Sequence, residues 1–184
     1  MAAAERAWAA ELLHFWFHDL RPDQWFGHSD VVDGELRRRF FRELARLAGR
    51  PATSFLTDPC TARAAVLLFD QCPRNLFRES ARAFATDPLA RAIAKGAVAR
   101  GWDRGLGKHE RQFLYMPLMH SEAIADQHLA LRLYAGLGDV FILRFARAHY
   151  RMVARFGRFP HRNAALGRTS TPAENRAVAD GNAW

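Results

Sequence analysis

The same helix-start signal occurs three times in this sequence, at Asp58-Pro59, Asp87-Pro88 and Thr171-Pro172. An Asp or Thr side chain accepts hydrogen bonds from the free amides of a first helical turn, while a proline at the first helical position loses no bond that the helix needs. At the third signal, Glu174 completes a capping box. We therefore expect a helix to begin at each of the three.

Apolar residues recur at helical spacing along most of the chain, and no stretch alternates apolar and polar residues as a strand would. The fold should therefore be all-α, with about eight helices in a compact antiparallel bundle or a short superhelix, forming a single domain over residues 1–184. The expected helices are 2–17, one capped within 29–34 and ending near 48, 58–71, 87–101, 108–115, 121–137, 139–157 and 171–184.

Prolines should end two of these helices. Helix 58–71 is apolar almost all round, which predicts a central position, and Pro73 should close it. Helix 108–115 should stop at Pro117 for the same reason, because a proline has no amide to continue the ladder of hydrogen bonds.

Helix 139–157 should start at a capping Asp139 and end at Gly157. Its residues Phe141, Phe145 and His149 fall on one face at helical intervals, so all three should turn toward the core. For His149 two interpretations remain open, a core histidine held by one hydrogen bond or a member of a functional site.

Composition and charge exclude several classes of protein. No run approaches about 18 uncharged apolar residues, and the N-terminal residues lack the pattern of a secretory leader, which predicts a cytoplasmic protein without a membrane partner. The net charge is +8, but it comes almost wholly from dispersed arginines, so we expect no nucleic-acid partner. Cys60 and Cys72 form no disulfide or zinc pattern and should be buried free thiols.

The stretch Arg155–Arg168 combines four arginines with His161, Asn163, two glycines and a proline. Arginine presents a planar fork of donors to carboxylate or phosphate, and the glycines and proline fix the backbone that carries it. This mixture predicts a binding site for an anion.

A second polar segment, Asp70–Asn75, directly follows the most apolar helix. Both it and Arg155–Arg168 begin where an apolar helix ends, and their arginines outnumber the acids nearby in the sequence. We therefore expect the two segments to form one pocket that holds an anion. The alternative is a structural network of Asp and Arg side chains that ties helix ends to loops.

The histidines, serines and cysteines indicate neither a metal nor a nucleophile. His120-Ser121-Glu122 lacks the spacing of zinc-binding helices, so we predict no bound metal and no cofactor. Ser121 or Cys72 would need an activating histidine, and no Gly-x-Ser-x-Gly motif is present. Catalytic residues are therefore not assigned.

The motifs Phe15-Trp16-Phe17, Leu68–Asn75, Arg82–Pro88, Arg111–Pro117, His120–Glu122 and Arg155–Asn163 span nearly the whole chain. Together they resemble the serial motifs of the bacterial domain-of-unknown-function family 924. The resemblance implies an all-helical fold grouped with the tetratricopeptide-like superfamily, and it transfers no activity, substrate or catalytic residue. Cys72 stands where the family usually has Phe, which argues against a thiol mechanism shared by the family.

These observations together predict a protein that binds a small anionic ligand, bearing phosphate or carboxylate, in one polar pocket. One alternative is a tetratricopeptide-like scaffold for a peptide, a partner protein or a second copy of the chain. Another is a metal-independent hydrolase that uses the same pocket. The candidate ligand-binding residues are Asp70, Arg74, Asn75, His120, Glu122, Gln127, His149, Arg158, His161, Arg162, Asn163 and Arg168.

Overall fold

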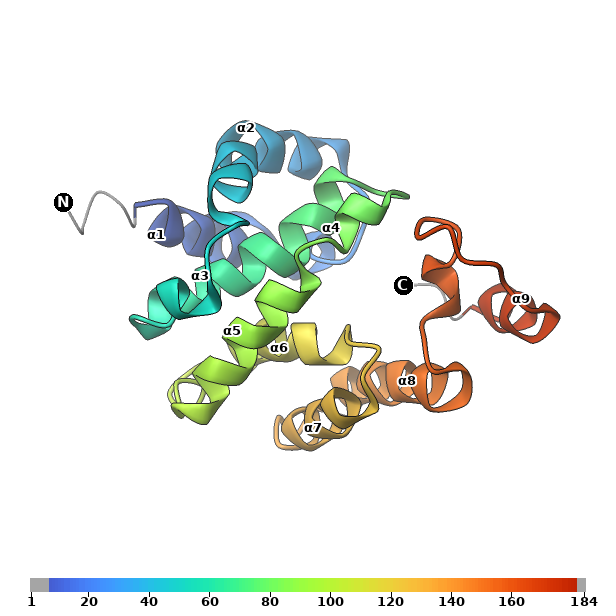
Figure 1. Cartoon of the computed structure of the whole chain (residues 1–184). Helices are drawn as coiled ribbons and strands as arrows, with labels where there is room; N and C mark the ends of the chain where they lie inside the picture. The colour runs from blue at the N-terminus through green and yellow to red at the C-terminus, as the bar shows by residue number, and fades with distance from the viewer. Residues whose placement is uncertain (1–6, 182–184) are drawn as a thin grey trace. The chain divides into compact units, whose positions relative to one another are not determined.

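The computed structural model describes residues 7–181, and that part of the chain contains nine α-helices and no strand (Figure 1). The prediction of an all-α fold is confirmed. The expected helix start at residue 2 and helix end at 184 lie outside the described residues. The α-helices are α1 Ala7–His14, α2 Asp30–Leu47, α3 Pro59–Val66, α4 Cys72–Leu76, α5 Asp87–Ala99, α6 Lys108–Met119, α7 Ile124–Ala135, α8 Val140–Phe156 and α9 Pro172–Ala179.

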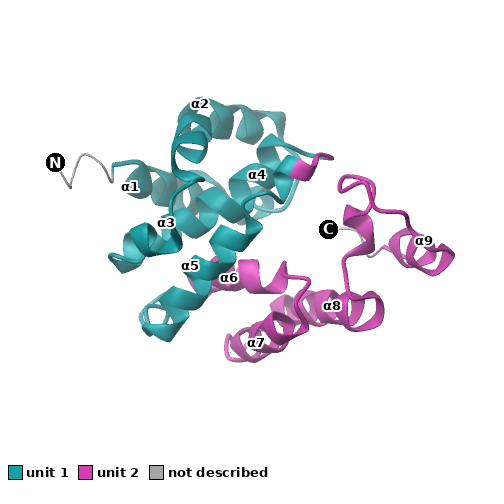
Figure 2. Ribbon diagram, viewed as in Figure 1, with its two compact units in different colours: residues 1–78, 82–106 teal, residues 79–81, 107–184 magenta. Residues whose placement is uncertain are grey.

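The helices belong to two compact units (Figure 2). Within the described residues, unit 1 comprises 7–78 and 82–106 and contains α1 to α5, while unit 2 comprises 79–81 and 107–181 and contains α6 to α9. That the whole chain is one domain stays a prediction. None of the helices in residues 7–181 is long and apolar enough to cross a membrane.

Unit 1 is organised around α3, which contacts both α1 and α5. The side chains of Ala62, Ala64 and Ala65 on α3 are fully buried. Their small size lets neighbouring helices approach closely, so the predicted central position of this helix is confirmed. α2 turns one apolar face inward, whose members are all buried: Leu36, Phe40, Leu44 and Leu47.

Pro73 does not end the helical run that begins with α3. After α3 the chain forms a π-helical turn, Leu67–Gln71, and continues into α4 with Pro73 in its first turn. The π turn changes the hydrogen-bonding pattern before the proline, and the first turn of a helix needs no amide donor there. The predicted stop at Pro73 is therefore wrong, and α4 raises the number of helices above the expected eight.

Unit 2 contains a second helix that passes a proline. α6 runs on to Met119 with Pro117 inside it, so the predicted stop is again wrong. Every residue from 112 to 119 is buried. Burial on all sides offsets the cost of an interior proline, which is typically about 3 kcal/mol.

At two of the three helix-start signals, the expected side chain caps the helix. Asp58 accepts the Thr61 amide at 2.8 Å, and Thr171 accepts the Glu174 amide at 3.2 Å in a complete capping box. A helix also begins at Asp87, but Asp87 is its first residue, and Thr86 holds the cap position without a side-chain cap bond. The Asp87 carboxylate binds an arginine.

α8 packs against α7 and, as predicted, starts at Asp139 and ends at Gly157. The Asp139 carboxylate accepts two backbone amides at 3.0 and 3.1 Å, and Gly157 has a φ of 70°, a left-handed conformation that glycine adopts without strain. The predicted core face is wrong in part, because Phe141 is 63% exposed and Phe145 37% exposed. Its buried residues are Ile142, Ala146, His149, Met152 and Val153, so His149 does point inward.

Candidate functional site

The candidate residues divide between the units. Asp70, Arg74 and Asn75 lie in unit 1, and the other candidates lie in unit 2. The structure places each group within its own unit, and their joining into one pocket stays a prediction.

In unit 1, Arg74 binds two carboxylates. Its Nη1 and Nη2 donate to the two carboxylate oxygens of Asp87 at 2.9 and 3.0 Å, and Nη1 lies 3.3 Å from Oδ1 of the fully buried Asp70. Burial alone would lower the pKa of Arg74, but the charges of Asp70 and Asp87 outweigh burial and raise that pKa. Gln71 also donates to Asp70, at 2.5 Å. These bonds join the π turn and α4 to the start of α5.

Asn75 joins the same segment to α2. Its Nδ2 donates to Asp33 Oδ1 at 3.0 Å, and Arg78 donates to both oxygens of that carboxylate, each at 3.0 Å. The Asp70–Asn75 segment therefore has a structural role within unit 1, because its polar groups tie α4 to α2 and α5.

In unit 2, Glu122 anchors the loop that follows α8. Its Oε1 accepts the Phe159 amide at 2.9 Å and Arg168 Nη1 at 2.8 Å. Burial alone would raise the pKa of Glu122, but the bonds from Arg168 and Phe159 and the charges of Arg168 and Arg162 outweigh it and lower the pKa. The carboxylate is therefore ionised and faces two arginines.

Arg158 binds Glu174 at the start of α9. Its Nε and Nη2 donate to the two carboxylate oxygens at 2.7 and 3.0 Å, and Nη2 also donates to the Thr169 carbonyl at 3.0 Å. The bond from Arg158, together with the Thr171 amide, lowers the pKa of Glu174 to about 2. Arg158 thus fastens α9 to the loop that begins at Gly157.

These pairs correct the argument that the arginines lack acids. Each of three candidate arginines has a carboxylate partner that lies distant in sequence. The pairs are Arg74 with Asp87, Arg158 with Glu174, and Arg168 with Glu122. All three carboxylates lie outside the two polar segments, so the sequence around each arginine does not contain its acidic partner.

Three of the remaining candidates of unit 2 contact Phe159, whose side chain is fully buried. The ring of His149 lies 5.5 Å from the Phe159 ring, the ring of His161 lies 5.7 Å from it, and the Arg162 guanidinium lies 4.6 Å above it. The His120 ring lies 5.9 Å from that of His149. We call His120, His149, His161 and Arg162 the histidine–arginine cluster.

His149 is the most deeply placed imidazole of the histidine–arginine cluster, at 4% exposure. Burial is the main cause that lowers its pKa to about 3; the charges of His120, Arg162 and His161 act in the same direction, and the bond to the Phe145 carbonyl opposes them. Nδ1 lies 2.9 Å from the Phe145 carbonyl, which can only accept, so Nδ1 carries the proton. At neutral pH the ring is therefore uncharged, and its Nε2 can act only as an acceptor.

Gln127 holds His120 in place through the backbone on either side of it. Its Nε2 donates to the carbonyls of Met119 and Ser121 at 2.7 and 2.6 Å. The Gln127 side chain is fully buried, and its Oε1 has no hydrogen-bond partner among the described residues. A water molecule or a ligand donor would satisfy that oxygen.

Ser121 and Asn163 hold the two turns that carry the histidine–arginine cluster. Ser121 Oγ donates to Asp126 at 2.7 Å and accepts the Ala123 amide at 3.1 Å. The fully buried Asn163 donates to Ser170 Oγ at 3.0 Å. Both residues therefore support the turns. The Ser121 hydroxyl donates to a carboxylate, whereas a nucleophilic serine is usually activated by a histidine.

The two thiols differ from each other. Cys72 is fully buried, and burial raises the pKa of its thiol above the ordinary range. Cys60 is exposed, so the prediction that both are buried is wrong for Cys60. It lies on the outer face of the first turn of α3.

Among residues 7–181, no three His, Cys, Asp or Glu side chains are grouped in a way that could hold a metal ion. On the surface, two histidines and one acid lie close together: the rings of His14 and His18 stack with centroids 5.2 Å apart, and His14 Nε2 lies 3.3 Å from Asp19 Oδ1.

Sequence reasoning missed the residue at the centre of the histidine–arginine cluster. Phe159 was counted only as part of a motif, although it stands directly before Pro160 and amid three polar candidates. It also missed Asp33, Asp87 and Glu174 as partners. Glu174 and Asp87 carried local signals, but these indicated a capping box and a helix start and did not indicate a bond to an arginine.

The comparisons with known proteins agree with this fold. The chain is similar to the solved structure of a protein of unknown function, ATU0120 from Agrobacterium tumefaciens, with a TM-score of 0.89 and 39% sequence identity. The match covers 98% of this chain and 100% of that chain. Among curated proteins, none matches. Residues 12–182 match the family described as "Bacterial protein of unknown function (DUF924)". The chain belongs to that family.

Proposed function

We propose that this is a cytosolic protein that binds a small anionic ligand, carrying a phosphate or carboxylate group, at the histidine–arginine cluster of unit 2. The observation that carries the proposal is that Arg162, His149 and His161 contact one buried ring, Phe159, and that His120 lies against His149. Arg162 is only 6% exposed. Its planar fork of N–H donors suits a phosphate or carboxylate group.

The balance of charge in this region supports the same ligand class. Glu122 lies within the electrostatic reach of Arg162, but the same carboxylate already accepts from Arg168 and from the Phe159 amide. Arg162 and Arg168 both act on this carboxylate, and the guanidinium group has the geometry that binds phosphate or carboxylate best. A phosphate or carboxylate beside these groups would form charge-assisted hydrogen bonds.

Binding is better supported than hydrolysis at this place. A general base works best when its pKa lies near the operating pH, and His149, with a pKa of about 3, is too weak a base at neutral pH. Ser121 is bonded to Asp126, and the Cys72 thiol resists ionisation. The described residues therefore supply donors for an anion more readily than an activated nucleophile.

A titration with inorganic phosphate at constant ionic strength, followed by NMR of the imidazole nitrogens, tests the proposal. Saturable shifts are expected for His120 and His161, with a rise in Tm that follows from mass action. Arg162→Lys keeps the charge but loses the planar fork, so it should weaken phosphate binding about tenfold or more. Arg151→Gln, an exposed position on α8, is the matched control and should leave binding unchanged.

Two outcomes would overturn the proposal. One is the absence of any saturable histidine shift. The other is a shift of the exposed His128 that equals those of His120 and His161, because it would indicate a diffuse effect of the salt on the surface.

A further inference from the structure

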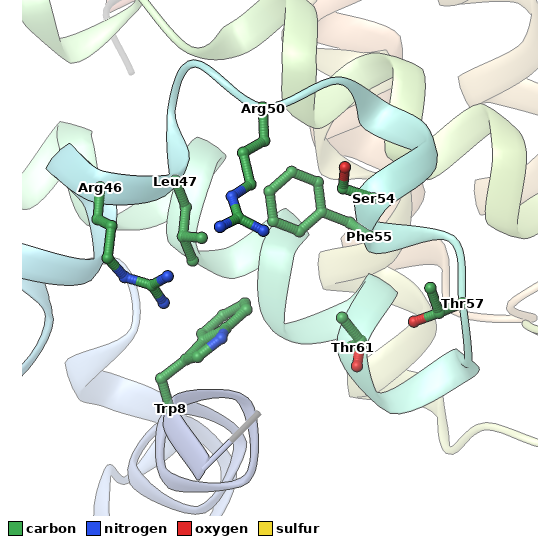
Figure 3. A pocket seen from close by; sticks show the side chains of 8 residues that line it. All are labelled: Trp8, Arg46, Leu47, Arg50, Ser54, Phe55, Thr57 and Thr61. Atoms are coloured by element: carbon green, nitrogen blue, oxygen red, sulfur yellow. The ribbon is translucent and has the colours of Figure 1, made fainter. Parts of the chain in front are cut away.

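Unit 1 contains a cavity of about 180 Å³ between α1 and the chain that follows α2 (Figure 3). One wall is apolar and buried, formed by Trp8, Leu47 and Phe55. The rim is polar and carries two guanidinium groups, Arg46 and Arg50. None of the residues of the histidine–arginine cluster lines this cavity.

Local structure fixes the apolar wall. Phe55 closes the short helical turn Ala52–Phe55, and its ring packs edge-on against Phe69 with centroids 5.1 Å apart. Leu47 is the last residue of α2, and Trp8 lies in the first turn described for α1. Three different elements therefore hold the indole, the phenyl ring and the leucine side chain, each less than 10% exposed.

The rim presents positive charge to the same space. In Figure 3 the guanidinium groups of Arg46 and Arg50 both point into the cavity above the indole of Trp8. Arg46 also donates to Glu43 at 2.6 Å, but Glu43 does not line the cavity. No carboxylate among residues 7–181 lies within ion-pair distance of Arg50, and no acidic residue lines the cavity there.

The hydroxyl groups of the lining divide into two kinds. Thr57 and Thr61 both donate to Asp58, at 3.2 and 2.7 Å, so their hydrogens are already used. Ser54 forms no side-chain hydrogen bond within the described residues and can donate to a ligand. The donors available at the rim are thus Arg50, Arg46 and Ser54, which together match a carboxylate.

We infer that this cavity binds a small monocyclic aromatic carboxylate, with its ring against Trp8 and Phe55 and its carboxylate between Arg46 and Arg50. The volume sets the size, because an apolar cavity of about 150 Å³ holds one benzene ring. A nucleotide exceeds this space. The aromatic walls favour a flat ring, whose edges and faces pack well against indole and phenyl groups. Its lining residues are not those of the anion site proposed in unit 2, and its aromatic wall adds the requirement for a ring.

The experiment measures binding of three probes to the full chain by calorimetry and by the NMR signal of the Trp8 indole N–H. Benzoate supplies the ring and the charge, benzamide supplies the ring alone, and acetate supplies the charge alone. Benzoate should bind saturably and shift the Trp8 signal, and the other two should bind at least about tenfold more weakly, because each lacks one of the two contributions.

Two variants test whether Arg50 binds the carboxylate of benzoate. Arg50→Gln should weaken benzoate binding about tenfold and leave benzamide binding unchanged. Arg42→Gln, an exposed position one turn before Arg46 and outside the lining, is the control and should change neither. Both positions are exposed, so the variants should keep the Tm of the parent chain.

The inference is overturned by absence of saturable benzoate binding up to about 10 mM, an affinity weaker than roughly −3 kcal/mol. It is also overturned if benzamide binds as tightly as benzoate, or if Arg42→Gln weakens benzoate as much as Arg50→Gln does. Arg162→Lys should leave benzoate binding intact, so failure of the phosphate site in unit 2 and failure of this site are distinguishable.

Discussion

Arg158 and Glu174 form a two-point ion pair that holds α9 against the loop after α8. Arg158 Nε lies 2.7 Å from Glu174 Oε1, and Nη2 lies 3.0 Å from Oε2. Glu174 also receives the Thr171 amide at 2.8 Å, so one carboxylate both completes a helix cap and binds the arginine. Its side chain is only 3% exposed. The pair therefore couples the folding of α9 to the position of the preceding loop.

Arg158→Ala should loosen α9 and leave the proposed phosphate site in place. Without the guanidinium, the buried Glu174 carboxylate keeps only the bond that it accepts from the Thr171 amide. Amide hydrogen exchange across 172–179 should become faster than in the parent chain, while phosphate should still shift the His161 resonance. Arg176→Ala, in the same helix, is the control and should change neither. Loss of the phosphate response with unchanged exchange in α9 would instead make Arg158 a ligand-binding residue.

His149 should make stability depend on pH. Its pKa is about 3 in the folded chain and near 6.5 when unfolded. Between these values the unfolded chain binds a proton that the folded chain does not, so the free energy of unfolding decreases as the pH falls below about 6.5. One such group contributes up to about 1.4 kcal/mol per pH unit.

Urea unfolding at a series of pH values measures this effect. In His149→Gln the free energy of unfolding should change less steeply with pH between about pH 6.5 and pH 4, by up to one proton taken up on unfolding. Glutamine can still donate to the Phe145 carbonyl, but it does not titrate. His128→Gln, at an exposed position, should retain the parent slope. Identical slopes in all three proteins would show that His149 titrates normally.

Much of the helical structure was predictable because its signals are local. Asp58, Asp139 and Thr171 cap helices through their own neighbouring amides, and Gly157 ends α8 in the left-handed conformation. Such contacts join residues a few positions apart, so the sequence pattern contains both partners.

The contacts that decide the candidate site are long-range, and sequence pattern does not contain them. Arg74 and Asp87 are 13 residues apart, and Arg168 and Glu122 are 46 apart. Counting acids near each arginine in the sequence therefore exaggerated the unpaired charge. Pro117 was misjudged for a related reason, because the burial that keeps α6 continuous comes from packing against other helices.

The two cysteines should differ sharply in reactivity toward a thiol reagent such as 5,5'-dithiobis(2-nitrobenzoate). Cys60 is exposed, whereas Cys72 is fully buried and the pKa of its thiol is raised by burial. Only thiolate reacts, so the native protein should release one equivalent of product quickly and the second only on unfolding. Cys60→Ser should abolish the fast reaction. A fast reaction that survives in this variant would mean that the Cys72 region opens readily.

Gln127→Glu should destabilise the folded chain at neutral pH, although the two side chains have nearly the same shape. Its Nε2 donates to the carbonyls on either side of His120, and a carboxylate cannot donate to them. Two buried carbonyls would lose their donor and face a negative charge, at a cost of about 1–3 kcal/mol for each unsatisfied group. The turn that positions His120 should loosen, and its imidazole resonance should move.

The pH dependence separates this explanation from a general packing defect. In Gln127→Glu the introduced carboxyl has a raised pKa in the folded chain, because only its protonated form can donate to a carbonyl. The folded state of this variant is therefore favoured below the unfolded pKa near 4.3, and that advantage is lost as the pH rises. Gln127→Met removes the donor without adding a titrating group, so its destabilisation relative to the parent should be the same at every pH. Urea unfolding of both variants between about pH 4 and pH 7 should therefore show a gap that widens with pH. A constant gap would mean that Gln127 acts through its volume alone and that its two hydrogen bonds do not hold the turn at His120.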